Sequence, residues 1–298
     1  MKFIQFNKFY RLFNIFSITL ILISILFLVI KGLNFGVDFK GGTLIELRTN
    51  NNIQISNIRD AFGKMNLGDV SVKNFGNEND YIIKFEKKNS NDPNFITEIK
   101  DELSKSIGNN FDIRRVENVG PKVSAELLKS GIIAIGLSLA AMLIYIWIRF
   151  EWQFSLGAIA ALFHDVIITL GIFSIFSLEI NLSIVAAVLT IVGYSMNDTV
   201  VIFDRVRENL KKISDIKIFE LTNISINETL SRTIITSATT LLALISIFIF
   251  GGEILKGFSF AMILGVIIGT YSSIYIANPI LVYLRVNYKT IIKEDKEK

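Results

Sequence analysis

Asp198 is a carboxylic acid that lies inside an apolar run of the sequence, residues 181–202. A charge at the centre of a membrane helix costs about 2.5–3.5 kcal/mol on insertion scales, so a chain that keeps one usually has a use for it. The uses that fit a single acid are proton or ion transfer, a substrate path, or a fixed ion pair. The sequence therefore singles out Asp198 as the first candidate for chemistry.

Arg232 is a second charge in an apolar region. The helix that carries Asp198 starts near Leu182, so Asp198 lies roughly 24 Å from that end at about 1.5 Å per residue. By the same rise, Arg232 lies roughly 27 Å before the end of the next apolar span at Phe250. Since consecutive spans run in opposite directions, we expect both charges at similar depth, as a proton-transfer pair. A structural ion pair that only fixes helix register remains open.

Hydroxyl side chains continue the face of Arg232. Thr236, Thr239 and Thr240 follow it at i+4, i+7 and i+8, positions that share one side of a helix. Together with Asn197 they form a predicted polar seam that could hold a file of water molecules. Ordinary hydrogen bonds between helices are the alternative for the threonines.

Asp165 is a third membrane acid, about ten residues into its span and thus roughly 15 Å deep. Thr169 lies on the same face of the predicted helix. We predict that Asp165 joins the seam in proton transfer, while a hydrogen bond that only packs helices is an equal alternative. His164 precedes Asp165, and we expect its imidazole to face lipid headgroups, a neighbouring helix or backbone.

The composition excludes several classes of site. The 298 residues are 51% hydrophobic, and the mean hydropathy of +0.50 is too apolar for an ordinary soluble domain. There is no cysteine and only one histidine, so neither a thiolate site nor a multi-histidine metal site is available. No nucleophile, base and orienting group occur together. We therefore predict no catalytic residue, no metal, no cofactor and no nucleic-acid partner.

Six apolar segments predict six membrane helices. The first is interpreted as an uncleaved helix, because no small-residue cleavage site follows it. Lysine and arginine cluster at 1–14, 204–232 and 286–298, whereas the short loops on the other side hold only Lys256. The positive-inside rule then places both termini in the cytoplasm. The predicted spans are 15–31, 132–148, 154–176, 182–203, 234–250 and 258–284, the last five within a bundle over 130–285.

Residues 32–129 carry the periodicities of a soluble α+β domain on the far side of the membrane. The order strand, helix, strand, strand, helix, strand is that of a ferredoxin-like split βαβ unit. The predicted strands are 43–48, 69–74, 81–85 and 111–116, and the predicted helices are 55–66 and 93–107, with Pro93 in the first turn. The predicted architecture is a polytopic α-helical membrane protein with one ferredoxin-like extracytoplasmic domain after its first helix.

Five ordered blocks of the sequence resemble the SecF family of bacterial protein-export membrane subunits. Gly193–Asn209 looks like the fourth-helix signature of that family. Asn34–Gly42 resembles the Asp-Phe-x-Gly-Gly motif that SecF shares with its partner SecD. The remaining blocks are 116–121, 164–169 and 232–237, and the resemblance covers nearly the whole chain.

The resemblance implies a stand-alone half-transporter of the resistance-nodulation-division type in the bacterial inner membrane. It implies SecD, the SecYEG channel and YajC as partners, a preprotein as substrate and the proton-motive force as energy source. The family's proton-conducting acid and arginine fall on Asp198 and Arg232. On this hypothesis Asp198 alternates between a carboxylate paired with Arg232 and a released carboxylic acid, and the resulting helix motion reaches the external domain.

Asp38, Gly41 and Gly42 belong to the motif shared with SecD. The glycines are expected to let the chain turn sharply as it leaves the bilayer, with direct substrate contact as the alternative.

Two other functions remain open. One is a proton-coupled exporter of small molecules on the same scaffold, which would usually have twelve helices in one chain. The other is a non-transporting scaffold in which the charged pair is structural.

Overall fold

The computed structural model describes residues 3–68, 70–75, 77–86, 95–213, 216–288 and 290. The chain divides into two compact units, a helical unit made of 1–34 with 133–298 and a second unit made of 35–132. Pro93, expected in the first turn of a helix, and most of the predicted tail 286–298 lie outside the described residues.

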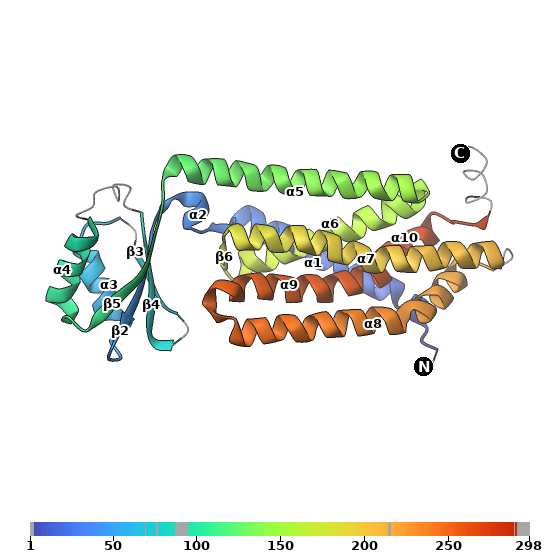
Figure 1. The fold of residues 1–298 in the computed structure, drawn as a ribbon. Helices are drawn as coiled ribbons and strands as arrows, with labels where there is room; N and C mark the ends of the chain where they lie inside the picture. Colours follow the sequence, from blue (N-terminus) through green and yellow to red (C-terminus); the bar gives the residue numbers. More distant parts are fainter. Residues whose placement is uncertain are drawn as a thin grey trace. The chain divides into compact units, whose positions relative to one another are not determined.

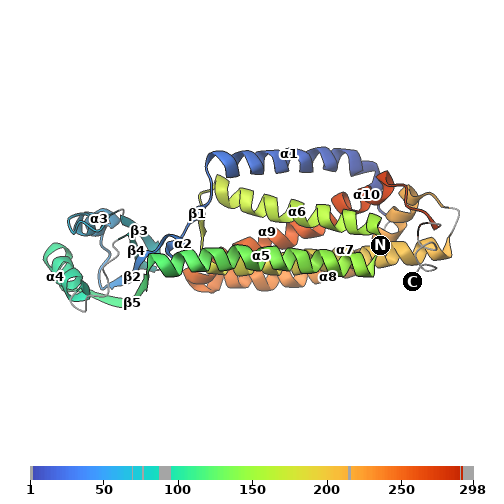
Figure 2. The same ribbon diagram turned by 90° about the horizontal axis from the view of Figure 1, so that it is seen from above.

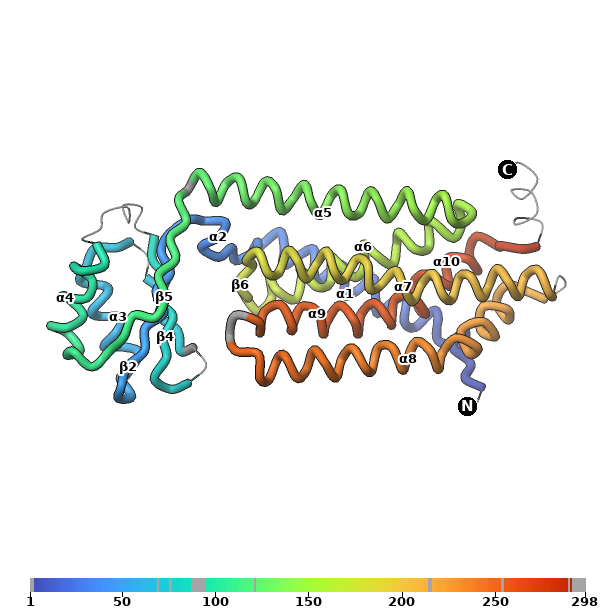
Figure 3. The backbone as a smooth tube through the Cα atoms, in the orientation of Figure 1, coloured from blue at the N-terminus to red at the C-terminus, as the bar shows by residue number. Residues whose placement is uncertain are grey.

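The described part of the chain contains six helices that are long and apolar enough to span a membrane, as the sequence predicts (Figures 1 and 2). A 3₁₀ turn precedes the first of them, and a π-helical turn follows the regular part of the sixth. The sixth span ends in a short final helix, α10 (Figure 3). Short strands follow the first and third spans. In order, these elements are η1 (Phe6–Phe9), α1 (Tyr10–Ile30), β1 (Asn34–Phe35), α5 (Pro121–Arg149), α6 (Trp152–Ile175), β6 (Glu179–Ile180), α7 (Leu182–Lys212), α8 (Ile218–Phe250), α9 (Gly252–Ser272), η2 (Ser273–Ala277) and α10 (Asn278–Tyr283).

Both α7 and α8 continue beyond their predicted apolar spans into charged sequence. On α7, Glu208 pairs with Arg205 at i,i+3 and with Lys212 at i,i+4, each at 2.6 Å. These pairs stabilise the charged extension of α7. A further ion pair joins the two helices, because Arg205 Nε donates to Glu228 Oε2 of α8 at 2.7 Å. Spacing within one helix could not have revealed this contact between helices.

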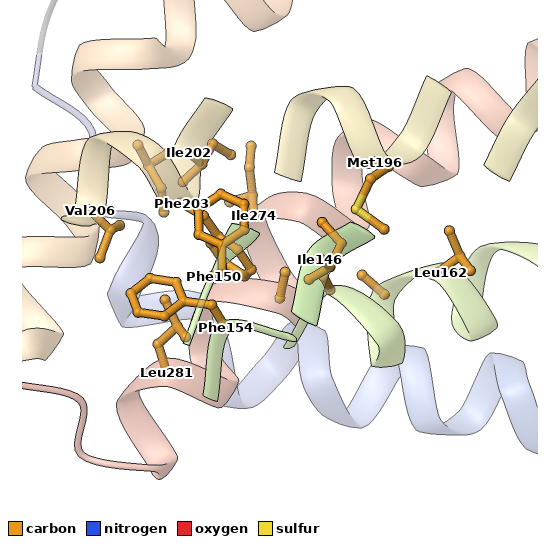
Figure 4. Close-up of a cluster of buried hydrophobic side chains, with 14 of the residues drawn as sticks. Ile146, Phe150, Phe154, Leu162, Met196, Ile202, Phe203, Val206, Ile274 and Leu281 are labelled. Atoms are coloured by element: carbon orange, nitrogen blue, oxygen red, sulfur yellow. The ribbon is translucent and has the colours of Figure 1, made fainter. Parts of the chain in front are cut away.

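The core of the helical unit is apolar and closely packed. Phe203 of α7 meets Phe154 of α6 edge-on, with 5.2 Å between ring centroids, and Phe150 completes the aromatic group (Figure 4). In lipid, helix association rests on van der Waals packing rather than on the removal of apolar surface from water. This interdigitation therefore fixes α6 and α7 against each other.

Two glycines bring α9 close to α7. A β-carbon built on Gly265 would lie 2.2 Å from Ile191 Cγ1, and one built on Gly269 would lie 3.0 Å from Ser195 Cβ. Small residues at such positions let helix backbones approach closely in membranes. The approach places the polar side chains of α7 and α9 within hydrogen-bonding reach of one another.

The second unit is a four-stranded antiparallel sheet with the strand order β3–β4–β2–β5. The order of elements along the chain is the predicted one, with boundaries shifted by a few residues. The strands are β2 (Gly42–Thr49), β3 (Val70–Phe75), β4 (Asn77–Phe85) and β5 (Phe111–Val119), and the helices are α2 (Val37–Lys40), α3 (Ile55–Gly63) and α4 (Phe95–Ile107).

Alternation along β2 separates the core of this unit from its open face. Ile45 and Leu47 are buried against Phe62 of α3 and their neighbours in the core. Arg48 points to the other face, where it lies directly opposite Asp80 of β4. Its guanidinium binds both carboxylate oxygens through Nε and Nη2. Such a bidentate pair is geometrically specific and ties β2 to β4.

Candidate functional site

Asp198 is buried in α7, with 3% of its surface exposed. The Thr270 hydroxyl of α9 donates to Asp198 Oδ2 at 3.4 Å, and the same hydroxyl lies 2.8 Å from Ser237 Oγ of α8. Because a hydroxyl group can both donate and accept, these three side chains link three helices through groups that can stabilise a carboxylate or pass on a proton. The acid that the sequence singles out is thus held in a polar contact.

Sequence reasoning missed both Ser237 and Thr270. A signal for Ser237 was present, because Thr229, Thr233 and Ser237 recur at every fourth residue of α8 and therefore share one face. All three residues are buried. Thr233 Oγ1 has no hydrogen-bond partner among the described residues. The polar face of α8 that points into the bundle is therefore the one that carries Thr229, Thr233 and Ser237.

Arg232 lies on the exposed side of α8, away from that inward face. No hydrogen bond or ion pair joins Arg232 to Asp198 in the described part of the chain, where Thr270 is the hydrogen-bond partner of Asp198. The expected direct pair thus differs from the observed geometry, in which Asp198 is brought together with the hydroxyls of Thr270 and Ser237.

The predicted threonine seam follows the same outward side of α8. Thr236 Oγ1 donates to the carbonyl of Arg232 and Thr239 Oγ1 to that of Ile235, each at 2.9 Å. Their hydroxyl hydrogens are therefore bound within their own helix. Thr240 is half-buried, and Asn197 is exposed on α7. Among the described residues, none of these four side chains forms a hydrogen bond with Asp198.

Asp165 of α6 is fully buried, with 1% of its surface exposed, and three side chains surround its carboxylate. Ser195 of α7 and Ser272 of α9 donate to Oδ2, the latter at 2.8 Å, and His164 Nδ1 lies 2.8 Å from Oδ1. Thr169, predicted to share the face, donates to the backbone carbonyl of Asp165 at 2.8 Å. Asp165 therefore joins α6, α7 and α9 in one hydrogen-bonded cluster.

His164 is buried beside Asp165, with 2% of its surface exposed. Its ring stacks on Tyr271 of α9, with 5.9 Å between centroids and 27° between planes. Of the surroundings expected for His164, the structure selects a neighbouring helix. The phenol of Tyr271 continues the network to α1, since it lies 2.7 Å from Ser17 Oγ and donates to the carbonyl of Phe13 at 2.8 Å.

Residues of α7 and α9 connect the two acids. On α7, Ser195 contacts Asp165 and lies one turn before Asp198. On α9, Thr270 contacts Asp198 and Ser272 contacts Asp165. Carboxylic acids, an imidazole and hydroxyl groups inside a helical bundle are the set of groups that proton relays in membranes use. The site is thus chemically suited to binding and releasing protons.

Asp38, Gly41 and Gly42 lie at the junction of α2 and β2. Gly41 has a φ of +79° and Gly42 a φ of +128°, values that residues with side chains rarely adopt. A β-carbon on Gly42 would also lie 2.5 Å from the carbonyl oxygen of Phe85. The backbone turn at this point therefore requires glycine, and Asp38 forms the first turn of α2.

Comparison with known proteins gives matches over most of the chain. The family described as "Protein export membrane protein SecD/SecF, C-terminal" matches residues 99–287, and the "SecD/SecF GG Motif" matches residues 26–53. A protein translocase subunit SecF from Rickettsia bellii is 48% identical over 280 residues, which cover 93% of this chain and 92% of the relative. A SecF from Cereibacter sphaeroides is 44% identical over 281 residues, covering 91% of this chain and 86% of the relative.

The fold is similar to that of solved SecDF structures. The crystal structure of SecDF from Thermus thermophilus, titled a translocon-associated membrane protein, superposes with a TM-score of 0.85 at 32% identity and covers 94% of this chain. SecDF in a super-membrane-facing form gives a TM-score of 0.72 at 30% identity. The chain spans 38% of the first SecDF chain and 40% of the second.

Proposed function

Because this chain belongs to the SecF family of protein translocase subunits, we propose that it uses the proton-motive force to promote the translocation of preproteins. Family membership and the six candidate spans describe a multi-pass membrane protein. Its proposed location is the bacterial inner membrane, with cytoplasmic termini, as the distribution of lysine and arginine favours. It acts as a transport subunit without covalent catalysis.

The second unit is proposed to be a ferredoxin-like domain on the extracytoplasmic side. Its antiparallel strand order β3–β4–β2–β5, with α3 after β2 and α4 after β4, supports this assignment. The turn at Gly41 and Gly42 would set the direction in which the chain enters that domain. A preprotein on this side of the membrane is the proposed substrate.

A SecD-like chain is the proposed principal partner, in an assembly with the SecYEG channel and YajC. In the most apolar 18-residue stretch of α6, 56% of the residues are buried, whereas in those of α5 and α8 only 11% and 17% of the residues are buried. Arg232 lies on this little-buried helix, and a charge facing lipid there would be costly. A partner bundle over that face of α8 would cover Arg232 and the outward threonines.

Asp198 is the proposed proton carrier. The observation that supports it best is a buried acid whose hydrogen bond leads through Thr270 to Ser237. A carboxylate at Asp198 only accepts, as it does from Thr270, whereas a carboxylic acid can also donate and so lets that hydroxyl reorient as an acceptor. Protonation would thereby change the contacts among α7, α8 and α9.

The energy available from protons is sufficient for a conformational change. One charge that crosses the membrane field yields about 2.3 kcal/mol per 100 mV. Shifting a two-state equilibrium from 1:99 to 99:1 takes about 5.5 kcal/mol. A few protons per cycle would therefore bias the position of the extracytoplasmic domain strongly.

The decisive experiment reconstitutes the chain with SecD and the channel in liposomes and measures proton-driven completion of preprotein translocation. We expect Asp198→Asn and Arg232→Met to lower that rate by about tenfold or more, equivalent to about 1.4 kcal/mol or more of lost driving interaction. Asp204→Asn is the matched control, because Asp204 lies on the same helix in a partly exposed pair with Arg149.

The outcomes separate the candidate functions. Wild-type rates in both Asp198→Asn and Arg232→Met would reject proton coupling through this site and favour a scaffold in which the charges are structural. Proton flux that depends on a small solute, without preprotein or SecD, would favour an exporter.

A further inference from the structure

We propose that His164 and Asp165 form a second proton-binding site, in which the proton is taken up at His164 Nε2. The inference rests on the proposed function for its role in transport, but the site itself can be tested without any transport measurement. The sequence pattern alone does not indicate a functional role for the His164 imidazole.

The hydrogen bonds of Asp165 limit the proton positions in the pair. Ser195 and Ser272 occupy Oδ2, and His164 Nδ1 lies 2.8 Å from Oδ1. When Asp165 is a carboxylate, which only accepts hydrogen bonds, Nδ1 carries a hydrogen and donates it. In the neutral imidazole, Nε2 is then a bare acceptor nitrogen.

The surroundings of Nε2 give the pair a reason to bind a proton. Both side chains are 1% exposed, and Nε2 is buried without a hydrogen-bond partner among the described residues. A buried carboxylate without a countercharge is costly in a medium of low polarity. A proton at Nε2 converts the pair to an imidazolium and a carboxylate 2.8 Å apart, with no net charge.

Few other groups influence this titration. Tyr271 of α9 is the titratable side chain in contact with the pair within the described chain, and Ser195 and Ser272 supply neutral hydroxyls. No lysine, arginine or further carboxylate forms a hydrogen bond or ion pair with His164 or Asp165 in the described ranges. From α7, Asp198 follows Ser195 by one turn and is the acid whose charge would couple to theirs.

The stack on Tyr271 gives a proton at His164 a structural consequence. A cation is attracted to an aromatic face, so an imidazolium holds the Tyr271 ring more strongly than a neutral imidazole does. Tyr271 is tied to α1 through Ser17 and the carbonyl of Phe13. The π-helical turn η2 begins two residues later, and such turns often lie at functional sites. Proton binding at α6 is thereby linked to the packing of α9 on α1.

The single histidine of the chain makes the site directly observable. The full chain, purified with an affinity tag that lacks histidine and placed in lipid nanodiscs, is labelled with ¹⁵N-histidine and titrated by solid-state NMR. We expect one protonated and one bare nitrogen at alkaline pH, and conversion of the bare nitrogen on acidification. In Asp165→Asn a smaller fraction of the imidazole should be protonated at the same acidic pH, since the attraction of the carboxylate for the imidazolium is lost.

Two results would overturn the proposal. One is an imidazole that keeps a bare nitrogen at every pH at which the chain remains folded. The other is a midpoint that Asp165→Asn leaves unchanged, with Asp165→Glu as the control that retains the carboxylate.

A function-based readout uses His164→Asn, whose amide can still donate to Asp165 but offers no second ring nitrogen. In the reconstituted translocase we expect this variant to assemble and to lose the pH dependence that wild-type translocation shows near the ¹⁵N midpoint. An unchanged pH profile would remove His164 from the transport cycle. If His164 titrates while Asp198→Asn translocates normally, the proton site stands and the proposed function fails.

Discussion

Gly265 of α9 lies so close to Ile191 of α7 that a β-carbon on the glycine would stand 2.2 Å from Ile191 Cγ1. This approach holds α7, which carries Asp198 and Ser195, against α9, which supplies a hydrogen-bond donor to each of the two buried acids. Ile191 is itself 1% exposed, so its side chain has little room to move.

Replacing that glycine should therefore loosen the site. We expect Gly265→Ala to destabilise the helical unit by about 1–3 kcal/mol through overpacking. Thermal unfolding in detergent measures the change, and Gly136→Ala is the control because a β-carbon on Gly136 meets nothing within 4 Å. Equal unfolding temperatures for the two variants would contradict the close packing. A higher unfolding temperature in the double variant Gly265→Ala, Ile191→Val than in Gly265→Ala alone would support it.

The pair Arg207 and Glu151 should stabilise the corner between α5 and α6. Arg207 Nη2 lies 2.9 Å from Glu151 Oε1, and the Glu151 side chain is 1% exposed. Removing one partner of a buried ion pair leaves an uncompensated charge, at a cost of about 3–5 kcal/mol. We expect Arg207→Met to approach that loss and Glu151→Gln in the same chain to restore part of it.

Lys212→Met tests the specificity of that effect. Lys212 pairs with Glu208 but is 60% exposed, and exposed pairs contribute about 0–1 kcal/mol. A loss in Lys212→Met as large as in Arg207→Met, measured by the same thermal unfolding, would show that burial is not the cause.

The β-sheet unit should lose stability in acid through Asp80. The hydrogen bonds from the Arg48 guanidinium hold the pKa of the Asp80 carboxyl below its usual value, although burial opposes this. The stabilisation is thus present above the unfolded pKa, about 3.9, and is lost as the pH falls through the lower folded pKa. Hydrogen exchange of β2 and β4 in the full chain should report the loss.

Asp80→Asn should remove that part of the pH dependence and lower protection of β2 and β4 at neutral pH. Asp101→Asn on the exposed side of α4 is the matched change of charge. Identical acid profiles for the wild type and Asp80→Asn would refute the role of the Arg48–Asp80 pair.

The two faces of α8 should differ in importance for transport. Ser237→Ala removes a hydroxyl that contacts Thr270, whereas Thr239→Val removes one that only bonds its own helix. A hydrogen bond contributes about 1 kcal/mol, so we expect about a fivefold slower proton-driven translocation in Ser237→Ala and little change in Thr239→Val. The reverse ranking would place the proton path on the outward face.

Much of the fold could be predicted from local pattern. Six apolar runs predicted the six candidate spans. Apolar residues that recur with a period of two or of 3.6 residues predicted the strands and helices of the β-sheet unit in their observed order. Asp198 and Asp165 could be singled out because a carboxylate in an apolar run is rare. These inferences needed only the neighbours of each residue along the chain.

The partners of the acids could not be predicted in this way. Similar depth in the membrane does not imply contact: Arg232 faces outward because packing against α7 and α9 sets the rotation of α8 about its axis. The same rotation turns Thr233 and Ser237 inward. His164 could not be judged either, since stacking on Tyr271 joins two helices that lie over a hundred residues apart in sequence.

The π-helical turn at Ser273–Ala277 interrupts the regular phase of the sixth span. Residues before it, including Thr270 and Ser272, contact the two acids, while Ala277, the last residue of the turn, presents its carbonyl oxygen to Gly157 of α6, 2.8 Å from where a β-carbon would stand. The turn therefore sets which side chains of the second half face α6 separately from those of the first half that face the two acids. Deleting one residue inside the turn would rotate one half of the span by about 100° relative to the other. Either the contacts with the two acids or the contact with Gly157 would then be lost.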